Sequence, residues 1–135
     1  MHRIFRLPAL VLMVWATGLF AQDRNAIESV ISDQMDAFVE RDIDRAWSHA
    51  SPNIKGIFGN PDNFARMVSE GYPMVWDNSE VRFLELREVA GNLWQKLMVR
   101  DALGGLAILD YQMIETPDGW QINAVQILPP PDVGA

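Results

Sequence analysis

The chain has 135 residues and carries 18 acidic against 11 basic side chains, which gives a formal net charge of −7. Binding to nucleic acid or to an anionic membrane surface requires clustered Lys and Arg, so neither is expected as a partner of so acidic a protein. The sequence contains no cysteine, which excludes disulfides, a cysteine nucleophile and a lipid anchor attached to cysteine.

The first 21 residues have the features of a cleaved export signal. Arg3 and Arg6 precede an apolar segment over residues 7–20, and the small residue Ala21 follows it. This segment of about 14 residues is shorter than the ~20 that a membrane-spanning helix needs. We therefore expect cleavage after Ala21 and a periplasmic or secreted location. Because Leu19 is bulkier than signal peptidases prefer at its position, an uncleaved anchor is the alternative.

Three helices are expected in the first half of the remaining chain. Over residues 25–40 the apolar side chains recur at steps of three and four, which predicts an amphipathic helix. A short second helix should span residues 43–49 and end before Pro52, because the residue preceding a proline avoids helical angles. A third helix should begin at Pro61 and end at Gly71 in a left-handed conformation.

After residue 78 the pattern changes from helical to extended. Apolar segments separated by turns that contain Gly or Pro predict an antiparallel meander, with strands over 81–89, 93–100, 106–115 and 120–128. Consecutive prolines end the last strand, so residues 129–135 should form a tail beyond a single domain over 22–128. Helices followed by a meander give an α+β fold, whose curved sheet should leave a cone-shaped hollow.

The local sequence resembles that of a family of short exported bacterial proteins of unknown function. The resemblance covers residues 26–128 and rests on Gln34, Ala37-Phe38, Asp42, Ala46, Ala50-Ser51-Pro52, Phe58-Gly59, Pro61, Phe64, Met67-Val68, Tyr72-Pro73, Asp101, Gly104, Tyr111 and Gly119-Trp120. It implies a nuclear-transport-factor-like fold, also called SnoaL-like or cystatin-like. It implies no particular activity, because this fold includes isomerases, dehydratases and cyclases as well as binding and assembly domains without catalysis.

No catalytic set is assigned, but Asp110, Tyr111 and His49 are candidates. Asp110 lies in an apolar strand and could act as a general base. The resemblance supports this role, since isomerases and dehydratases of this fold use an aspartate, often with a tyrosine. An ion pair with Lys96 or Arg100 on a solvent-facing sheet would explain Asp110 equally well. His49, the only histidine beyond the signal, could be a base, but its place at a helix end is also explained by the helix dipole.

Gln34, Phe58, Tyr72 and Trp76 are the candidates for ligand binding. Gln34 lies in the apolar stripe of the first helix, so it must bond either to a loop around residues 51–58 or to a ligand. The three aromatic residues suit the rim of a hollow, although packing of the third helix on the sheet would explain them too. No metal site and no cofactor are expected, since the ligand sets and the phosphate-binding loop are missing.

These features favour an exported domain that binds a small apolar ligand or a protein partner, in the hollow or at its rim, without catalysis. The first alternative is a lyase or isomerase with Asp110 as general base. The second is a homodimeric assembly module, in which Trp94, Met98 and Leu109 form a patch on the open sheet.

Overall fold

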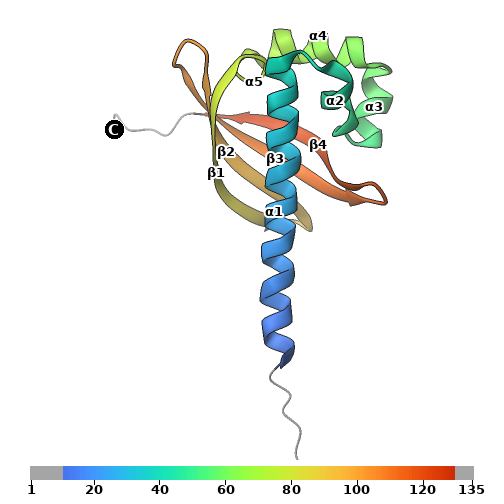
Figure 1. Ribbon diagram of the computed structural model, residues 1–135, viewed down its shortest axis with the longest axis vertical. Coiled ribbons are helices and arrows are strands. Elements are labelled where there is room, and N and C mark those ends of the chain that lie inside the picture. The colour runs from blue at the N-terminus through green and yellow to red at the C-terminus, as the bar shows by residue number, and fades with distance from the viewer. Residues whose placement is uncertain (1–10, 130–135) are drawn as a thin grey trace, which may run out of the picture.

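The computed structural model describes residues 11–129, with side chains from residue 21 onward. Within this range the elements follow the order α1 (Val11–Glu40), α2 (Ile43–Ser48), α3 (Pro52–Phe58), α4 (Pro61–Gly71), α5 (Pro73–Trp76), β1 (Asn78–Val89), β2 (Asn92–Asp101), β3 (Leu106–Thr116) and β4 (Gly119–Leu128). The strands form one antiparallel sheet in the order β1-β2-β3-β4, and the helices gather on one of its faces (Figure 1). The predicted α+β meander is therefore confirmed, and its cone-like arrangement is consistent with a SnoaL-like fold.

The prediction of three helices is wrong, because the described residues contain two further short helices that begin at prolines. Pro52 opens α3, and the preceding Ser51 caps this helix by accepting a hydrogen bond at its Oγ from the amide of Ile54 at 3.2 Å. Pro73 opens α5 in the same way. Proline suits the first helical position because its missing N–H would have no helical partner there. Each of these prolines thus follows one helix and begins the next.

Two helix boundaries also differ from the expectation. α1 begins at Val11 rather than at residue 25 and continues without a break through Ala21. α4 does end at Gly71, but that residue is not left-handed, and the chain leaves the helix through Tyr72 at φ −134°. Among the described residues, no helix combines the length and the apolar character that crossing a membrane requires. Residues 1–10 of the predicted signal and 130–135 of the predicted tail lie outside the described residues, so both remain predictions.

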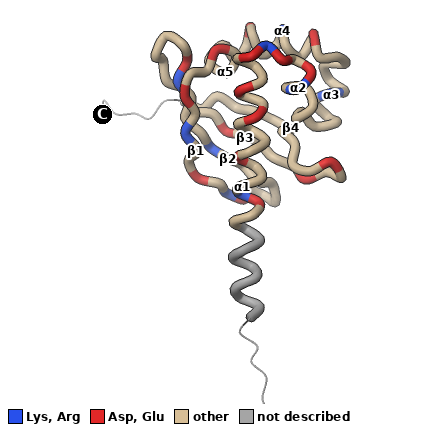
Figure 2. Tube along the Cα trace, in the orientation of Figure 1, with Lys and Arg blue, Asp and Glu red and all other residues tan. Residues whose placement is uncertain are grey.

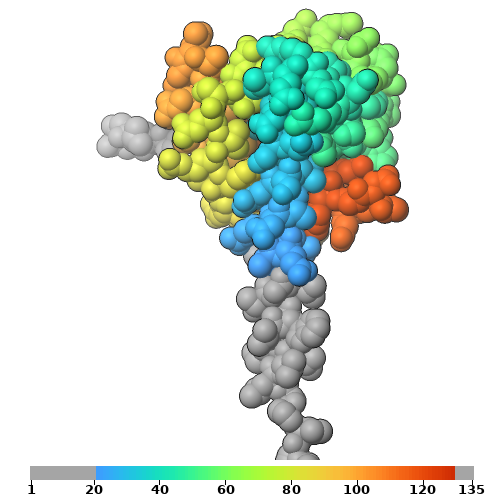
Figure 3. All heavy atoms as spheres, in the orientation of Figure 1, coloured from blue at the N-terminus to red at the C-terminus, as the bar shows by residue number. Residues whose placement is uncertain are grey.

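The core lies between α1 and the sheet. Ile27, Ile31 and Phe38 of α1 are at most 1% exposed and belong to one buried cluster with sheet residues such as Leu97 and Leu109. Full burial of each such side chain contributes about 1.5–3 kcal/mol. Acidic residues recur along α1 (Figure 2), and two of them, Asp36 and Glu40, are exposed. α1 lies across the front of the molecule between the outer strands β1 and β4 (Figure 3). The amphipathic pattern of this helix therefore sets its orientation on the sheet.

The turns follow the chemistry of their residues. Ala90 and Gly91 join β1 to β2 with φ values of 52° and 85°, the left-handed pair that matches the twist of a two-residue hairpin. Between β2 and β3 the carboxylate of Asp101 accepts hydrogen bonds from the amides of Leu103 and Gly105, at 2.9 and 2.8 Å. The four predicted strands are confirmed, with ends that shift by a few residues at most.

The junction of α2 and α3 is tied to the sheet by a short backbone clamp, formed by residues 49–51 and β4. Ala50 pairs with Ile122, whose amide donates to the carbonyl of His49 and whose carbonyl accepts from the amide of Ser51, both at 2.9 Å. The fully buried Ser51 also donates through its Oγ to Oδ1 of Asn123 at 2.8 Å. This clamp fixes the position at which α3 starts across the edge of the core.

Candidate functional site

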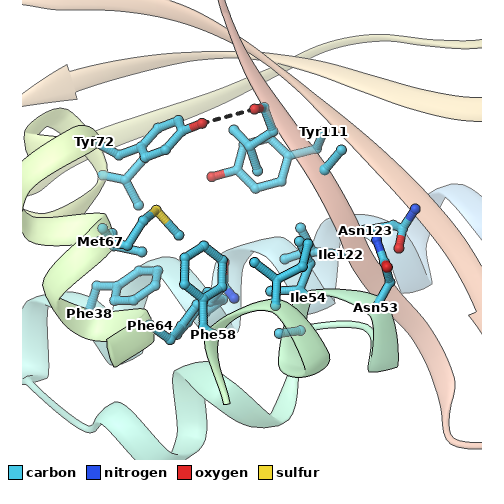
Figure 4. Close-up of a pocket in the computed structure, with 17 residues that line it drawn as sticks. Phe38, Asn53, Ile54, Phe58, Phe64, Met67, Tyr72, Tyr111, Ile122 and Asn123 are labelled. Carbon is cyan, nitrogen blue, oxygen red and sulfur yellow. Dashed lines mark hydrogen bonds between the residues drawn. The ribbon is translucent and has the colours of Figure 1, made fainter. Parts of the chain in front are cut away.

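A cavity of about 360 Å³ lies between α1, α3 and α4 on one side and β3 and β4 on the other (Figure 4). Most of its wall is apolar and includes Phe38, Phe64, Val68 and Ile122. None of its 17 lining residues is an aspartate, glutamate, lysine, arginine or histidine. The volume falls toward the lower end of the range that is usual for small-molecule sites, about 300–1,000 Å³.

α3 is the least firmly packed part of this wall. None of its residues is buried, although Ile54, Ile57 and Phe58 all line the cavity. Ile57 is 64% exposed, so it reaches both the cavity and the outer surface. Segments with few buried contacts open at the lowest free-energy cost, which makes α3 the side through which a molecule could enter.

Two tyrosines bring hydroxyl groups into this apolar wall. Tyr72 donates from its hydroxyl to the carbonyl of Val125 at 3.0 Å. The Tyr111 side chain is 1% exposed, and within the described part of the chain its hydroxyl has no hydrogen-bond partner. Burial raises the pKa of Tyr111 well above its ordinary value, so the hydroxyl keeps its proton at any physiological pH. Figure 4 shows this hydroxyl pointing into the cavity, on the side where Tyr72 lies.

Gln34 also lines the cavity, but its amide already serves the fold. It is 4% exposed, and its Nε2 donates to the carbonyl of Ala46 at 3.0 Å. The bond joins α1 to α2, so the expectation of a partner around residues 51–58 is wrong. Its side-chain donor is satisfied inside the protein, as burial requires.

The asparagine side of the cavity was not predicted from the sequence. Asn53 and Asn123 both line it. Asn123 accepts from Ser51, and its Nδ2 donates to Oε1 of Gln112 at 2.8 Å, so both polar atoms of its amide are engaged. It sits where the pairing of β3 and β4 is irregular. The polar residue beside the apolar Ile122 was the one sign in the sequence that Asn123 could line the cavity. The irregular pairing that places Asn123 there depends on β3, so the sequence of β4 alone does not reveal it.

Trp76 does not line the cavity, in contrast to Phe58 and Tyr72. The guanidinium of Arg41 lies 4.1 Å from the centroid of its ring, and the same group donates to the Trp76 carbonyl at 2.7 Å. Arg41 also forms a 2.6 Å ion pair with Asp77. Trp76 therefore anchors the turn between α1 and α2 against α5, which is a structural role.

His49 also lies outside the cavity, in an ion-pair cluster on the surface between α1 and α2. Its Nε2 is 2.7 Å from Oδ2 of Asp33, and the carboxylate can only accept this bond. Arg45 donates to the other oxygen of Asp33 at 2.8 Å and to Glu40 at 2.8 Å. The bonds from Arg45 and then His49 lower the pKa of Asp33 from 3.8 to about 2. The ring of His49 thus has a structural partner and does not face the cavity.

Asp110 lies on the opposite face of the sheet from the cavity. Its neighbour Tyr111 faces the cavity, and successive residues of a strand point to opposite faces. Both oxygens of Asp110 accept from Arg87, each at 2.8 Å, with side-chain exposures of 7% and 27%. The partner is neither Lys96 nor Arg100, which pair with glutamates of β1. Asp110 therefore does not have the geometry expected of a base that acts on a molecule in the cavity.

The sheet patch expected for dimerisation is not contiguous. Leu109 is fully buried in the core, on the face that the helices cover. Trp94 and Met98 alternate with the buried residues Gln95, Leu97 and Val99 of β2, so they lie on the other face and are only partly buried. Including Leu109 in one patch with these two residues is thus wrong.

The model of a family described as "Domain of unknown function (DUF4864)" matches residues 20–135. No curated protein and no solved structure matches the chain. In the part of the chain that the structure describes, no group of three or more His, Cys, Asp or Glu residues is placed to hold a metal ion.

The Arg87–Asp110 pair predicts a stability effect that depends on which partner is removed. Arg87→Met leaves a nearly buried carboxylate without its partner and should lower the free energy of unfolding by about 2–3 kcal/mol. The double variant Arg87→Met/Asp110→Leu should recover most of this loss, because no charge is then left buried. Urea unfolding measures all three proteins, with Arg82→Met, an exposed arginine of the same strand, as control. Loss of catalytic turnover in a folded Asp110→Asn variant would contradict the structural role.

The Asp33 cluster predicts a pH dependence. Because the fold lowers the pKa of Asp33 from 3.8 to about 2, its carboxylate stabilises the protein above that range, and the contribution is lost as the pH falls toward 2. Asp33→Asn should therefore cost no more than about 1 kcal/mol at neutral pH, since solvent screens so exposed a cluster. The difference from wild type should shrink as urea titrations move from neutral pH to about pH 2. The control is Glu115→Gln, an exposed acid. A difference that is constant with pH would refute the assignment.

Proposed function

Because the chain belongs to the family of the domain of unknown function DUF4864, whose description assigns no activity, we propose its function from the cavity. The expected membership of an uncharacterised family is confirmed. In our proposal the protein binds a small, mostly apolar molecule between its helices and its sheet. One observation carries the proposal: an apolar cavity of about 360 Å³ that has no charged lining residue.

The physical chemistry of the cavity supports binding of an apolar molecule. Removing apolar surface from water contributes about 25 cal/mol per Å², and the walls offer aromatic and aliphatic side chains for this contact. The rings of Phe58 and Phe64 pack edge to face, with centroids 6.2 Å apart, on the side of the cavity across from Tyr111 (Figure 4). A compact apolar body would therefore contact rings on both sides.

The same geometry favours binding over catalysis. Asp110 and His49 are the acid–base candidates, and each has a protein partner at a distance from the cavity. Tyr111 remains, but its raised pKa makes it a hydrogen-bond donor and a poor base at neutral pH. We place the binding in the periplasm or outside the cell, on the support of the signal-like residues 1–21.

Native mass spectrometry of protein purified from its own export compartment, together with a solvent extract of that preparation, tests this function. We expect a small bound mass in the wild type. Val68→Phe should abolish it, because Val68 is buried and lines the cavity, so the larger ring fills the space. The matched control is Val39→Phe, the same change at a half-exposed helical position that does not line the cavity, and it should keep the bound mass.

The intact mass of the preparation should also correspond to a chain that begins at Gln22. A bound mass that survives in a folded Val68→Phe protein would contradict the cavity as its site. An empty monomer, with no molecule in the extract, would contradict the proposed function and favour a protein partner at the rim, where Ile57 is exposed.

A further inference from the structure

The strongest unexplained feature of the cavity is the hydroxyl of Tyr111. From it we propose that the cavity selects an uncharged ligand that presents an acceptor oxygen, such as a ketone or ester carbonyl, to this hydroxyl. This inference rests on the proposed function and adds the chemical class of the ligand. Its evidence is the position, burial and missing partner of one side chain, together with the charge of the surrounding wall.

The Tyr111 hydroxyl is a buried polar group of the cavity that has no partner in the described part of the chain. The residue is 1% exposed, and its hydroxyl forms no hydrogen bond with any residue that the structure describes. Buried polar groups in native proteins nearly always have a partner, either from the protein or from a bound molecule. Since Figure 4 shows the hydroxyl pointing into the cavity, its partner should be a molecule that enters there.

The nearest part of the backbone does not supply this partner. Val125 is the cross-strand neighbour of Tyr111, but the Val125 carbonyl already accepts from Tyr72. Gln34 forms no hydrogen bond with this hydroxyl, since its side-chain bond runs from Nε2 to the carbonyl of Ala46. Both polar atoms of the Asn123 amide are engaged with Ser51 and Gln112. The hydrogen bonds of these neighbours thus do not include the Tyr111 hydroxyl, which can donate to a ligand.

The charge of the wall restricts the ligand to neutral molecules. The cavity has no charged lining residue, and an ion without a partner is strongly disfavoured in an apolar site. Arg66 and Glu70 line a separate groove formed by α3 and α4 and do not line the cavity. Because burial raises the pKa of Tyr111, the hydroxyl keeps the proton that it can donate to a ligand, and a carbonyl oxygen is an acceptor that matches it.

Three naphthalene probes of similar shape separate these requirements. 2-Acetylnaphthalene carries the acceptor oxygen, 2-isopropylnaphthalene lacks it, and 2-naphthoate replaces it with a charge. Isothermal titration of the full mature chain should give the ketone about 3- to 10-fold higher affinity than the hydrocarbon, as one neutral hydrogen bond allows. The naphthoate should bind more weakly than either.

Tyr111→Phe should remove the preference for the ketone while the affinity for 2-isopropylnaphthalene stays within about twofold, because the ring and the cavity shape are kept. Tyr72→Phe is the matched control, since its hydroxyl already has a protein partner, and it should keep the preference. Thermal unfolding of both variants verifies that they are folded. The ratio of affinities in the wild type tests the inference even if a variant fails to fold.

The failures of the two proposals can be told apart. If no probe binds the wild type, the proposed function is contradicted. A second outcome is that the probes bind and Val68→Phe blocks them, but the ketone binds no more tightly than the hydrocarbon. In that case the cavity remains the binding site and the proposed role of Tyr111 is overturned. Tightest binding of 2-naphthoate would overturn the requirement for an uncharged ligand.

Discussion

Burial of one face of α1 against the sheet is the interaction on which the rest of this structure depends. Ile27, Ile31 and Phe38 have almost no exposed surface, and they hold the helix across a curved four-stranded sheet. A single helix, about 10 Å wide, cannot cover the whole face of such a sheet. The short helices α3 to α5 cover the remainder, and their side chains do not fill it. The cavity is thus a consequence of covering a curved sheet with one long helix and several short ones.

The clamp between residues 49–51 and β4 decides the form of this cavity. It fixes the start of α3, while the other end of α3 leads into Gly59, whose φ of 83° is a conformation that glycine adopts readily. α3 is therefore held at its start and has no buried residue along its length. α3 thus has a defined position and can move away from the cavity at a low free-energy cost. A ligand site that is enclosed by protein requires such a segment.

The separation of charged groups from the cavity gives the site its chemical character. The two buried or partly buried ion-pair systems, Arg87–Asp110 and the cluster around Asp33, lie on other surfaces and stabilise contacts between elements. An acidic protein can thus contain a neutral site, because none of the many charged residues that the structure describes (Figure 2) lines the cavity. In the site that we propose, the Tyr111 hydroxyl, which is unpaired among the described residues, would then have a large share in selectivity, since no charged side chain lines the cavity.

The sequence alone determined the elements and their order, because helix periodicity, capping and turn chemistry depend on residues within a few positions of each other. The strands, α2 and the amphipathic face of α1 followed from these local signals. The starts of α3 at Pro52 and of α5 at Pro73 carry the same local signal that predicted the start of a helix at Pro61. The pairing of Asp110 with Arg87 and the exclusion of Trp76 from the cavity join residues distant in sequence, so local patterns could not contain them. Alternation along β3 places Asp110 and Tyr111 on opposite faces of the strand. Because both faces carry apolar residues, the sequence did not show which face lies in the core. Only the packing of the helices against one face decided that Tyr111, and not Asp110, meets the cavity.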